Sequence, residues 1–282
     1  MKNILFSLFK TIGQKLSGRG LGNYSWVGAW YQALFRALRP RGIVEISFRD
    51  FRLRVNATDP GIAPWLLMGK EFSPAEVRLL ERLLKPGMAF VDVGANIGYF
   101  SLLAAKLVGP AGRVYAFEPD EENFSLLQQN IELNNLHNIV AVKKGISDKI
   151  GQTILYRDLE NPCRHSLAPK PNGETVMIET TTLDNFFADL GQIDFIKVDV
   201  EGAEPAVLQG MKKLVQINPR LILLTEFYPQ AINKFGSSPE KYLNDLKKLD
   251  FSLFGISEDR NFQPVALEQI KKLINLVGLK GY

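Results

Sequence analysis

The sequence is poor in sulfur and imidazole ligands, with a single cysteine, Cys163, and two histidines among 282 residues. One cysteine excludes an internal disulfide and is typical of a reducing compartment. So few Cys and His side chains also argue against a zinc centre, and we assign no metal ligand of this kind. No apolar run is long enough to span a bilayer, and residues 4–9, which resemble a signal-peptide core, stop at Lys10. We therefore expect a cytoplasmic protein.

Acidic residues are absent before Glu45. Residues 1–54 hold ten Lys/Arg and two acids, a formal charge of +8, which leaves −4 for the rest of a chain whose net charge is +4. Apolar residues recur at helical spacing in two stretches separated by glycines: Ile4, Leu5, Leu8, Phe9, Ile12 and Leu16, then Gly18, Gly20 and Gly22, then Trp26, Val27, Trp30, Tyr31, Leu34, Phe35 and Leu38. This pattern predicts two basic amphipathic helices.

Two interpretations of residues 1–40 remain open. The helices could make peripheral contact with an anionic membrane surface. Alternatively, their apolar faces cover the following domain or a substrate channel, which is favoured because apolar stripes at helical spacing are usually core. The isoelectric point near 9.0 comes from this segment, which carries no nucleic-acid recognition motif, so we expect no nucleic-acid partner.

A hairpin and a loop follow the basic helices. Residues 43–55 alternate in two halves around Arg49-Asp50, which predicts a β-hairpin, and Asp59-Pro60-Gly61 marks a loop. We therefore predict an N-terminal region, 1–60, and a larger domain, 61–282. Ser73 and Glu76 have the spacing of a capping box at the start of the domain's first helix.

The stretch Ala89–Phe100, A-F-V-D-V-G-A-N-I-G-Y-F, organises the larger domain. Its apolar first half, Ala89–Val93, predicts a strand buried on both faces, and its second half opens a helix. The turn between them, 94–98, lies where an open α/β sheet binds a nucleotide-like ligand. Its two glycines, Gly94 and Gly98, allow the backbone to approach that ligand closely.

The chemistry of this turn indicates a cationic ligand without a pyrophosphate. Asn96 replaces the middle glycine of the G-x-G-x-x-G phosphate loop. Asp92 just before the turn would repel a pyrophosphate and favour a sulfonium or an ammonium. The next predicted strand, Arg113–Phe117, ends at Glu118, which is placed to accept hydrogen bonds from ribose hydroxyls. S-adenosylmethionine is a molecule with these properties.

Predicted strands and helices alternate through the rest of the domain. The further core strands are Ile139–Val142, Ile193–Val198 and Leu221–Leu224, and two short ones follow at Phe251–Gly255 and Gln263–Ala266. Extra strands, Thr153–Tyr156 and Val176–Thr180, flank an irregular segment, Asn161–Gly173. This alternation predicts an α/β fold with a mostly parallel, doubly wound, seven-stranded sheet.

Polar residues beyond the first turn are further candidates. Ser147 and Asp148 could contact an adenine or form an Asx or ST turn. Lys197 shares a strand face with Asp199 and could be its ion-pair partner. Glu201 and Glu204 instead suit the dipole of the next helix. The expected cofactor-binding residues are therefore Asp92, Gly94, Asn96, Gly98, Glu118, Ser147 and Asp148.

Five motifs in order resemble one known family. V-D-V-G-A-N-I-G-Y-F-S, A-F-E-P, S-D, T-L-D and I-K-V-D-V-E-G-A-E fall at predicted strand ends within Phe90–Phe227. Together they resemble the FkbM-type S-adenosylmethionine-dependent methyltransferases. The resemblance implies a Rossmann-like class I methyltransferase fold and O-methylation of a sugar or secondary-metabolite hydroxyl, so the expected partner is a small-molecule or glycan acceptor.

Methyl transfer from a sulfonium is an in-line displacement that needs an aligned acceptor and, for an alcohol, a base. Asp199 and Glu226 end neighbouring strands, and His165 in the irregular segment is the third candidate, although a histidine in a polar loop is more often a surface residue. Asp199 ranks first as base or acceptor-positioning residue. A divalent cation shared by Asp199 and Glu226 ranks second.

Three other functions were weighed. An N-methyltransferase would use the same fold. An NAD-dependent oxidoreductase is disfavoured because the turn lacks the middle glycine and follows Asp92. A membrane-associated binding protein without catalysis is disfavoured by the intact acids Asp92, Glu118 and Asp199.

Overall fold

The computed structural model describes residues 2–16, 25–158, 161, 165–168, 173–189, 191–256, 262–264 and 274–281. The chain forms two compact units, Met1–Phe72 and Ser73–Tyr282. The sequence placed a boundary at residue 60, whereas helix α3 (Ala63–Leu67) packs against the first strand of the hairpin and so belongs to the first unit. The glycines of the predicted interhelical break, Gly18, Gly20 and Gly22, lie outside the described residues, as does Cys163.

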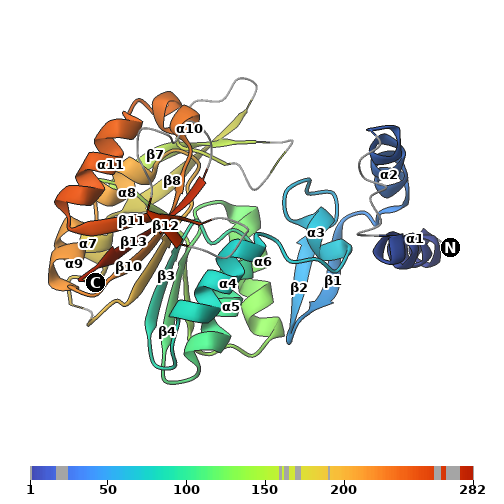
Figure 1. Cartoon of the computed structure of the whole chain (residues 1–282), viewed down its shortest axis with the longest axis horizontal. Coiled ribbons are helices and arrows are strands. Elements are labelled where there is room, and N and C mark those ends of the chain that lie inside the picture. The colour runs from blue at the N-terminus through green and yellow to red at the C-terminus, as the bar shows by residue number, and fades with distance from the viewer. Residues whose placement is uncertain are drawn as a thin grey trace. The chain divides into compact units, whose positions relative to one another are not determined.

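The first unit consists of two paired helices, a hairpin and a short helix (Figure 1). Helices α1 (Lys2–Leu16) and α2 (Ser25–Leu38) confirm the two predicted apolar periodicities. Strands β1 (Ile43–Phe48) and β2 (Phe51–Asn56) pair antiparallel around Arg49-Asp50, as predicted. Among the helices that the structure describes, none is long and apolar enough to cross a membrane.

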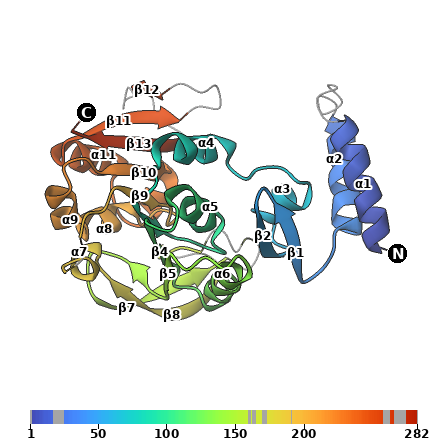
Figure 2. The same cartoon turned by 90° about the horizontal axis from the view of Figure 1, so that it is seen from below.

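The second unit is built on a mixed sheet (Figures 1 and 2). Its order across the sheet is β12 (Phe262–Pro264), β11 (Phe251–Ile256), β13 (Ile274–Lys280), β10 (Ile222–Phe227), β9 (Phe195–Val198), β3 (Ala89–Val93), β4 (Arg113–Phe117) and β5 (Ile139–Val142). The strands from β10 to β5 are parallel to one another, and β13 runs antiparallel to β10 and β11. This confirms the predicted α/β fold with a mostly parallel sheet.

Helices cover both faces of this sheet (Figures 1 and 2). One face carries α4 (Pro74–Leu83), α5 (Tyr99–Val108) and α6 (Glu121–Leu133). The other carries α7 (Leu183–Phe186), α8 (Glu204–Gln209), α9 (Lys212–Ile217) and α11 (Pro239–Lys248). A further helix, α10 (Pro229–Lys234), follows β10. The apolar strand runs predicted this burial on two faces, and the strand side chains of β3, β9 and β10 are almost all inaccessible.

A small second sheet confirms the predicted extra strands. Strands β7 (Gly151–Arg157) and β8 (Glu174–Thr181) pair antiparallel, and β6 (Gly145–Ile146) joins β8 on its other side. Of the irregular segment between β7 and β8, the structure describes residues 161, 165–168 and 173. Ser166 bridges to Tyr156 of β7, which anchors this segment on the small sheet.

The carboxyl-terminal strands differ from the prediction. The sequence placed the last strand at Gln263–Ala266, but β12 contributes only a short edge there, and residues 265–266 lie outside the described part. The missed strand is β13, which inserts between β10 and β11. Gly278 interrupts the alternation of side chains along β13. A Cβ on Gly278 would lie 2.9 Å from Phe251 Cδ1, so only glycine fits beside this ring.

The strand order reverses direction at β3, which pairs with β4 on one side and with β9 on the other. In an open α/β sheet, ligands bind outside the carboxyl ends of the strands at such a switch point. The loops after β3, β4, β9 and β10 converge on that edge and define the candidate site.

Candidate functional site

The turn after β3 is shaped by residues in the left-handed backbone region. Gly94 and Gly98 have φ of 86° and 91°, and Asn96 adopts φ of 51° with its side-chain oxygen accepting from Ile97 N at 2.8 Å. The sequence allowed Asn96 to cap the following helix, but the residue that precedes α5 is Gly98. Asn96 instead stabilises the turn itself, so its side chain lies in the loop that would face a ligand.

The two glycines are also required by protein packing. A Cβ on Gly94 would lie 2.0 Å from the Asp199 carbonyl oxygen, and one on Gly98 would lie 2.6 Å from Leu127 Cδ1. The sequence analysis explained these glycines by close approach of a ligand, whereas a Cβ at either position would collide with protein atoms. The turn after β3 and the loop after β9 are therefore in direct contact at Gly94, which places Asp199 beside the predicted cofactor loop.

Glu118 links the loop after β4 to the turn after β3. Its Oε2 accepts from Asn96 N at 2.8 Å and its Oε1 accepts from Asp120 N at 2.9 Å. Burial raises the pKa of Glu118 to about 8, although the two backbone N–H bonds lower it. When Glu118 is ionised, its carboxylate offers about four acceptor sites, two of which accept from these backbone N–H groups. Contact of Glu118 with a ribose stays a prediction.

Asp92 is placed differently from the prediction. The sequence put its carboxylate on the lip of the site, but Asp92 is 1% exposed within β3, in register with Lys197 of β9. Its Oδ2 accepts from Ser101 Oγ at 2.6 Å, and its Oδ1 has no hydrogen-bond partner among the described residues. Burial raises the pKa of Asp92, and the neighbouring Lys197 lowers it. Asp92 therefore belongs to a buried charge cluster with Lys197.

Lys197 is the cation at the centre of that cluster. Its Nζ donates to Asp199 Oδ2 at 2.8 Å and lies 4.6 Å from the centre of the Phe100 ring, which confirms the predicted ion pair. Burial lowers the pKa of Lys197, but the carboxylates of Asp199, Glu76 and Asp92 outweigh it and hold that pKa above its usual value. Lys197 therefore stays charged and fixes the orientation of the Asp199 carboxylate.

Glu76 belongs to the same cluster and was read from the sequence as half of a capping box. Ser73 makes no side-chain capping bond to α4. Glu76 is instead buried, accepts a hydrogen bond from Asn275 of β13, and has its pKa raised to about 7 by burial. Ser73 hydrogen-bonds to its side chain, but its other partners come from strands far along the chain, so local spacing could not reveal this role.

Three carboxylates meet at the edge formed by the loops after β9 and β10. One oxygen each from Asp199, Glu201 and Glu226 lie within 4.8 Å of one another. Glu226 is inside β10 rather than after it, because the strand extends to Phe227. Burial, with Asp199 and Glu201 nearby, raises the pKa of Glu226. Three such groups repel when all are ionised, so the cluster favours a shared proton or a bound divalent cation.

Glu204 stabilises the loop after β9. Its Oε1 accepts from Val200 N at 3.1 Å and from Gly202 N at 3.2 Å, and burial raises its pKa to about 7. Glu204 lies in the first turn of α8, as its charge predicted, whereas Glu201 precedes the helix with φ of 53°. The sequence assigned both acids to the helix, and the left-handed backbone at Glu201 turns it toward the carboxylate cluster instead.

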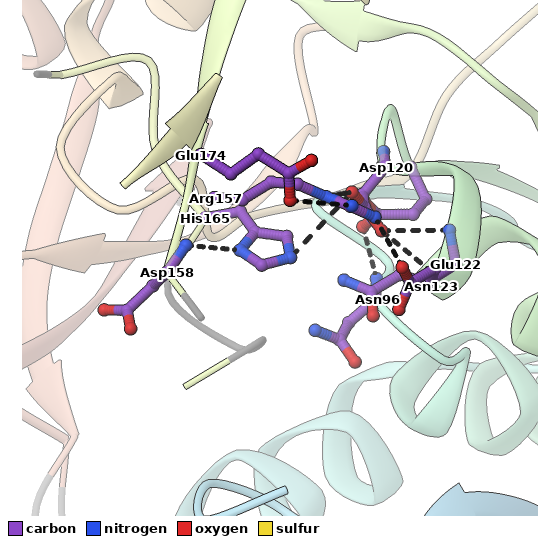
Figure 3. Close-up of polar contacts among 9 residues, drawn as sticks. Asn96, Asp120, Glu122, Asn123, Arg157, Asp158, His165 and Glu174 are labelled. Atoms are coloured by element: carbon purple, nitrogen blue, oxygen red, sulfur yellow. Dashed lines mark hydrogen bonds and ion pairs between the residues drawn. The ribbon is translucent and has the colours of Figure 1, made fainter. Parts of the chain in front are cut away.

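His165 lies in a different network (Figure 3). Its Nδ1 accepts from Asp158 N at 3.0 Å, and its Nε2 is 3.9 Å from Asp120 Oδ2. Figure 3 shows the imidazole ring between these two residues. Because one nitrogen is occupied by a backbone donor and the other faces Asp120, the described contacts assign His165 to this network rather than to the Asp199–Glu226 edge.

Arg157 anchors the same network to the cofactor loops. Its Nε donates to Asp120 Oδ2 at 2.6 Å, and it pairs with Glu122 and Glu174 at 3.2 and 3.4 Å (Figure 3). Asp120 also caps α6 and follows Glu118 by two residues. The sequence analysis did not identify Arg157 as a site residue, because it lies in one of the extra strands. Its proximity to the turn at residues 118–120 depends on the tertiary position of β7.

Ser147 and Asp148 follow β6 in the small sheet. Ser147 N donates to Thr181 O, and its side chain donates to Asp148 Oδ1 at 3.0 Å, a local turn of the kind that the sequence allowed. Ser147 is buried and Asp148 is exposed. Contact of these two residues with an adenine stays a prediction.

The first prediction from this geometry concerns Glu118. Glu118→Gln would place an amide where two backbone N–H groups need acceptors and ribose hydroxyls need a carboxylate. We expect the affinity for S-adenosylhomocysteine to fall by about 1.5–3 kcal/mol, the range for hydrogen bonds to charged groups. Calorimetric titration measures this loss. Glu121→Gln, an exposed carboxylate three residues later, is the matched control, and equal affinities for both variants would remove Glu118 from the ribose site.

Comparison with known proteins gave a family match. A model described as the methyltransferase FkbM domain matches residues 92–253, which include every residue predicted for the site. Methyltransferase 1 of Beauveria bassiana is 33% identical over 144 residues, 43% of this chain and 57% of its own length. Methyltransferase sdnD of Sordaria araneosa is 30% identical over 154 residues, 43% of this chain and 59% of its own length.

The chain is also similar to a ribosomal protein methyltransferase and to a solved structure. The ribosomal protein L11 methyltransferase of Chloroflexus aurantiacus is 30% identical over 132 residues, 45% of this chain and 39% of its own length. The chain thus spans between 39% and 59% of these three curated relatives. A solved structure of the FkbM methyltransferase of Methylobacillus flagellatus is 16% identical, with a TM-score of 0.44, over 77% of this chain and 52% of that one.

Proposed function

Because this chain belongs to the FkbM family of S-adenosylmethionine-dependent methyltransferases, we propose that it transfers a methyl group from that cofactor to a hydroxyl of a small molecule or glycan. The observation that carries the proposal is the contact between Gly94 and the Asp199 carbonyl. It brings the turn predicted to hold the cofactor against a loop whose carboxylates can receive the acceptor's proton.

The residues of the β3 and β4 loops suit this cofactor. Glu118 provides acceptor sites for ribose hydroxyls, and the left-handed turn from Gly94 to Gly98 presents a close backbone surface. The buried acids Asp92 and Glu76 and the half-buried Asp199 lie around Lys197, so carboxyl groups outnumber the cation in this cluster. Such a set favours a nucleoside with a positive sulfonium over one with a pyrophosphate.

In the proposed reaction, Asp199 receives the proton of the acceptor hydroxyl. The bound cofactor supplies an electrophilic methyl carbon, so a carbon–oxygen bond forms as the carbon–sulfur bond breaks. Lys197 holds the Asp199 carboxylate at 2.8 Å, which restricts its orientation and leaves its second oxygen for the acceptor. The raised pKa of Glu226 favours its protonated form, which can donate a hydrogen bond beside that base.

Ligand-dependent stability tests the cofactor assignment. S-adenosylhomocysteine at about one hundred times its Kd should raise the free energy of unfolding by about 2.7 kcal/mol, and NAD should leave it unchanged. The readout is the Tm in the presence of each ligand. Stabilisation by NAD alone would favour the oxidoreductase and end the methyltransferase proposal.

A pH-dependent stability is expected from Glu226. A carboxyl group whose pKa is raised by folding binds its proton more tightly in the folded state, so its contribution is present below the unfolded pKa and is lost as pH rises. We expect the free energy of unfolding to decline from about pH 5 toward pH 9, and to decline less in Glu226→Gln. Denaturant unfolding across this range measures both slopes.

The control for this prediction is Glu132→Gln, which removes an exposed carboxylate of α6. It should keep the wild-type slope. A Glu226→Gln slope as steep as that of the wild type would mean that Glu226 is ionised in the folded protein. Magnesium ions that flatten the wild-type slope, but not that of Glu226→Gln, would instead point to a cation held by the three carboxylates.

A further inference from the structure

Helices α1 and α2 pair through aromatic rings. The Phe6 and Phe35 rings are 6.0 Å apart between centroids, and the Phe9 and Tyr31 rings are 5.0 Å apart. Since an earlier residue of α1 meets a later residue of α2, the two helices are antiparallel. Phe6 and Phe35 are each 8% exposed, so these rings form the internal seam of the pair.

A second apolar stripe remains outside this seam. We call it the outer stripe; its members are Leu5, Leu8, Ile12, Trp30 and Leu34. Leu5 and Leu8 directly precede seam residues of α1, and Trp30 and Leu34 directly precede those of α2. One residue corresponds to a rotation of about 100° in an α-helix. In two antiparallel helices, a step of one residue back from the seam turns both side chains toward the same side of the pair. The outer stripe is therefore one continuous face.

The outer stripe is accessible in the first unit. Its side chains are between 45% and 67% exposed, with Trp30 the highest. Helical apolar stripes are usually core, and that role is taken here by the aromatic seam. An additional exposed face of aliphatic side chains and a tryptophan on a basic helix pair is a feature of interaction surfaces.

The charge of the helices selects the partner. Residues 1–44 contain seven Lys/Arg and no acid, and Lys15, which extends the outer stripe by one turn beyond Ile12, is exposed. A second copy would bring two such cationic segments together, which is unfavourable. An anionic bilayer supplies both an apolar boundary and negative headgroups. We propose that the outer stripe docks this protein on the surface of an anionic lipid bilayer.

Trp30 gives a direct readout of this docking. All three tryptophans of the chain, Trp26, Trp30 and Trp65, lie in the first unit, so Trp26→Phe with Trp65→Phe leaves Trp30 as the only tryptophan of the full chain. Vesicles of phosphatidylcholine with phosphatidylglycerol should shift Trp30 emission to shorter wavelength and carry the protein down on sedimentation. Vesicles of phosphatidylcholine alone should bind far less, and added salt should weaken binding to the anionic ones.

Substitutions in the outer stripe separate docking from folding. Leu8→Gln and Ile12→Gln should each weaken partition into anionic vesicles by about tenfold, since each removes a large apolar side chain from the bilayer boundary. Lys15→Gln should weaken it about fivefold through lost attraction to headgroups. The matched controls are Ile150→Gln and Met177→Gln in the second unit, which remove side chains of similar exposure and should bind as the wild type does.

Three results would overturn this proposal. Wild-type protein that stays in solution with anionic vesicles at low salt would do so. A monomer whose Trp30 emission is already blue-shifted without vesicles would also overturn it, because the second unit would then cover the outer stripe. A blue shift that tracks protein concentration and a dimer in analytical centrifugation would assign the stripe to a second copy. Stabilisation by S-adenosylhomocysteine is measured independently in each variant, so failure of docking leaves the proposed chemistry untouched.

Discussion

Replacing Asp199 by Asn is expected to lower turnover by about 10²–10⁴-fold, the contribution typical of a positioned base. The Asp199 side chain is 36% exposed, bonded to Lys197 Nζ, and adjacent to the turn at Gly94. Asparagine has nearly the same shape as aspartate and can still accept a hydrogen bond from Lys197, but it cannot act as a base and receive a proton. Affinity for S-adenosylhomocysteine should therefore stay within a few-fold. The assay follows release of S-adenosylhomocysteine with a panel of sugar and secondary-metabolite hydroxyl acceptors.

The control for Asp199→Asn lies at the opposite end of the same strand. Asp194 precedes β9 and accepts from Ala89 N at 2.8 Å, which an asparagine oxygen can also do. Asp194→Asn should keep wild-type turnover. Undiminished turnover in Asp199→Asn would contradict both a base and a ligand role for this residue. With an unprotonated amine as acceptor the base is dispensable, so a small effect confined to amines would favour N-methylation.

A chelator distinguishes the two roles considered for the acidic edge. We expect EDTA to leave wild-type turnover unchanged if Asp199 acts as a base. Asp199, Glu201 and Glu226 are close enough to share a divalent cation, which would lower the acceptor pKa directly. Complete inhibition by EDTA with recovery on adding magnesium would replace the base with a metal held by these three residues.

Gly94→Ala is expected to destabilise the protein strongly, by about 2–5 kcal/mol, before any cofactor is bound. Two costs add at this position: φ is 86°, and the new Cβ would lie 2.0 Å from the Asp199 carbonyl oxygen. The collision can be relieved only if the loops after β3 and β9 separate, so the affinity for S-adenosylhomocysteine should fall as well. Denaturant unfolding in the absence of cofactor measures the first effect.

Gly87 isolates the backbone part of this cost. Its φ is 87°, nearly that of Gly94, but a Cβ there would meet nothing within 4 Å. Gly87→Ala should therefore cost only the strain of a left-handed alanine, about 1–2 kcal/mol. The difference between the two variants reports the collision with Asp199. Equal losses would show that the two loops move apart freely and that the contact does not position Asp199.

The turn after β3 was predictable because its information is local. A buried strand, two glycines and a helical periodicity occupy Ala89–Val108, and the strand bounds agree with the prediction. The same holds for β4, β5 and the hairpin around Arg49-Asp50. Order along the chain then places Glu118 and Asp199 at one sheet edge, since parallel strands share a carboxyl end.

Local patterns were misleading where a residue's partner is distant in sequence. Asp92 looked accessible next to a glycine turn, but register with Lys197 buries it. Glu76 fitted a capping box, but β13, which the sequence did not reveal, provides Asn275 as its partner. His165 was the third candidate base, in a loop where a histidine is more often a surface residue, but the structure places its second nitrogen 3.9 Å from Asp120 Oδ2.

The sequence by itself determined the α/β fold and the family, and it predicted the turn after β3 and the acids near the carboxyl ends of the strands as the site, because these depend on periodicity and on order along one chain. Only the tertiary structure decided which charges are buried together, that Glu201 joins Asp199 and Glu226, and that Gly94 packs on the Asp199 carbonyl. Those relations depend on strand register and on left-handed backbone at single residues. A contact between two loops more than a hundred residues apart leaves no pattern in either loop alone.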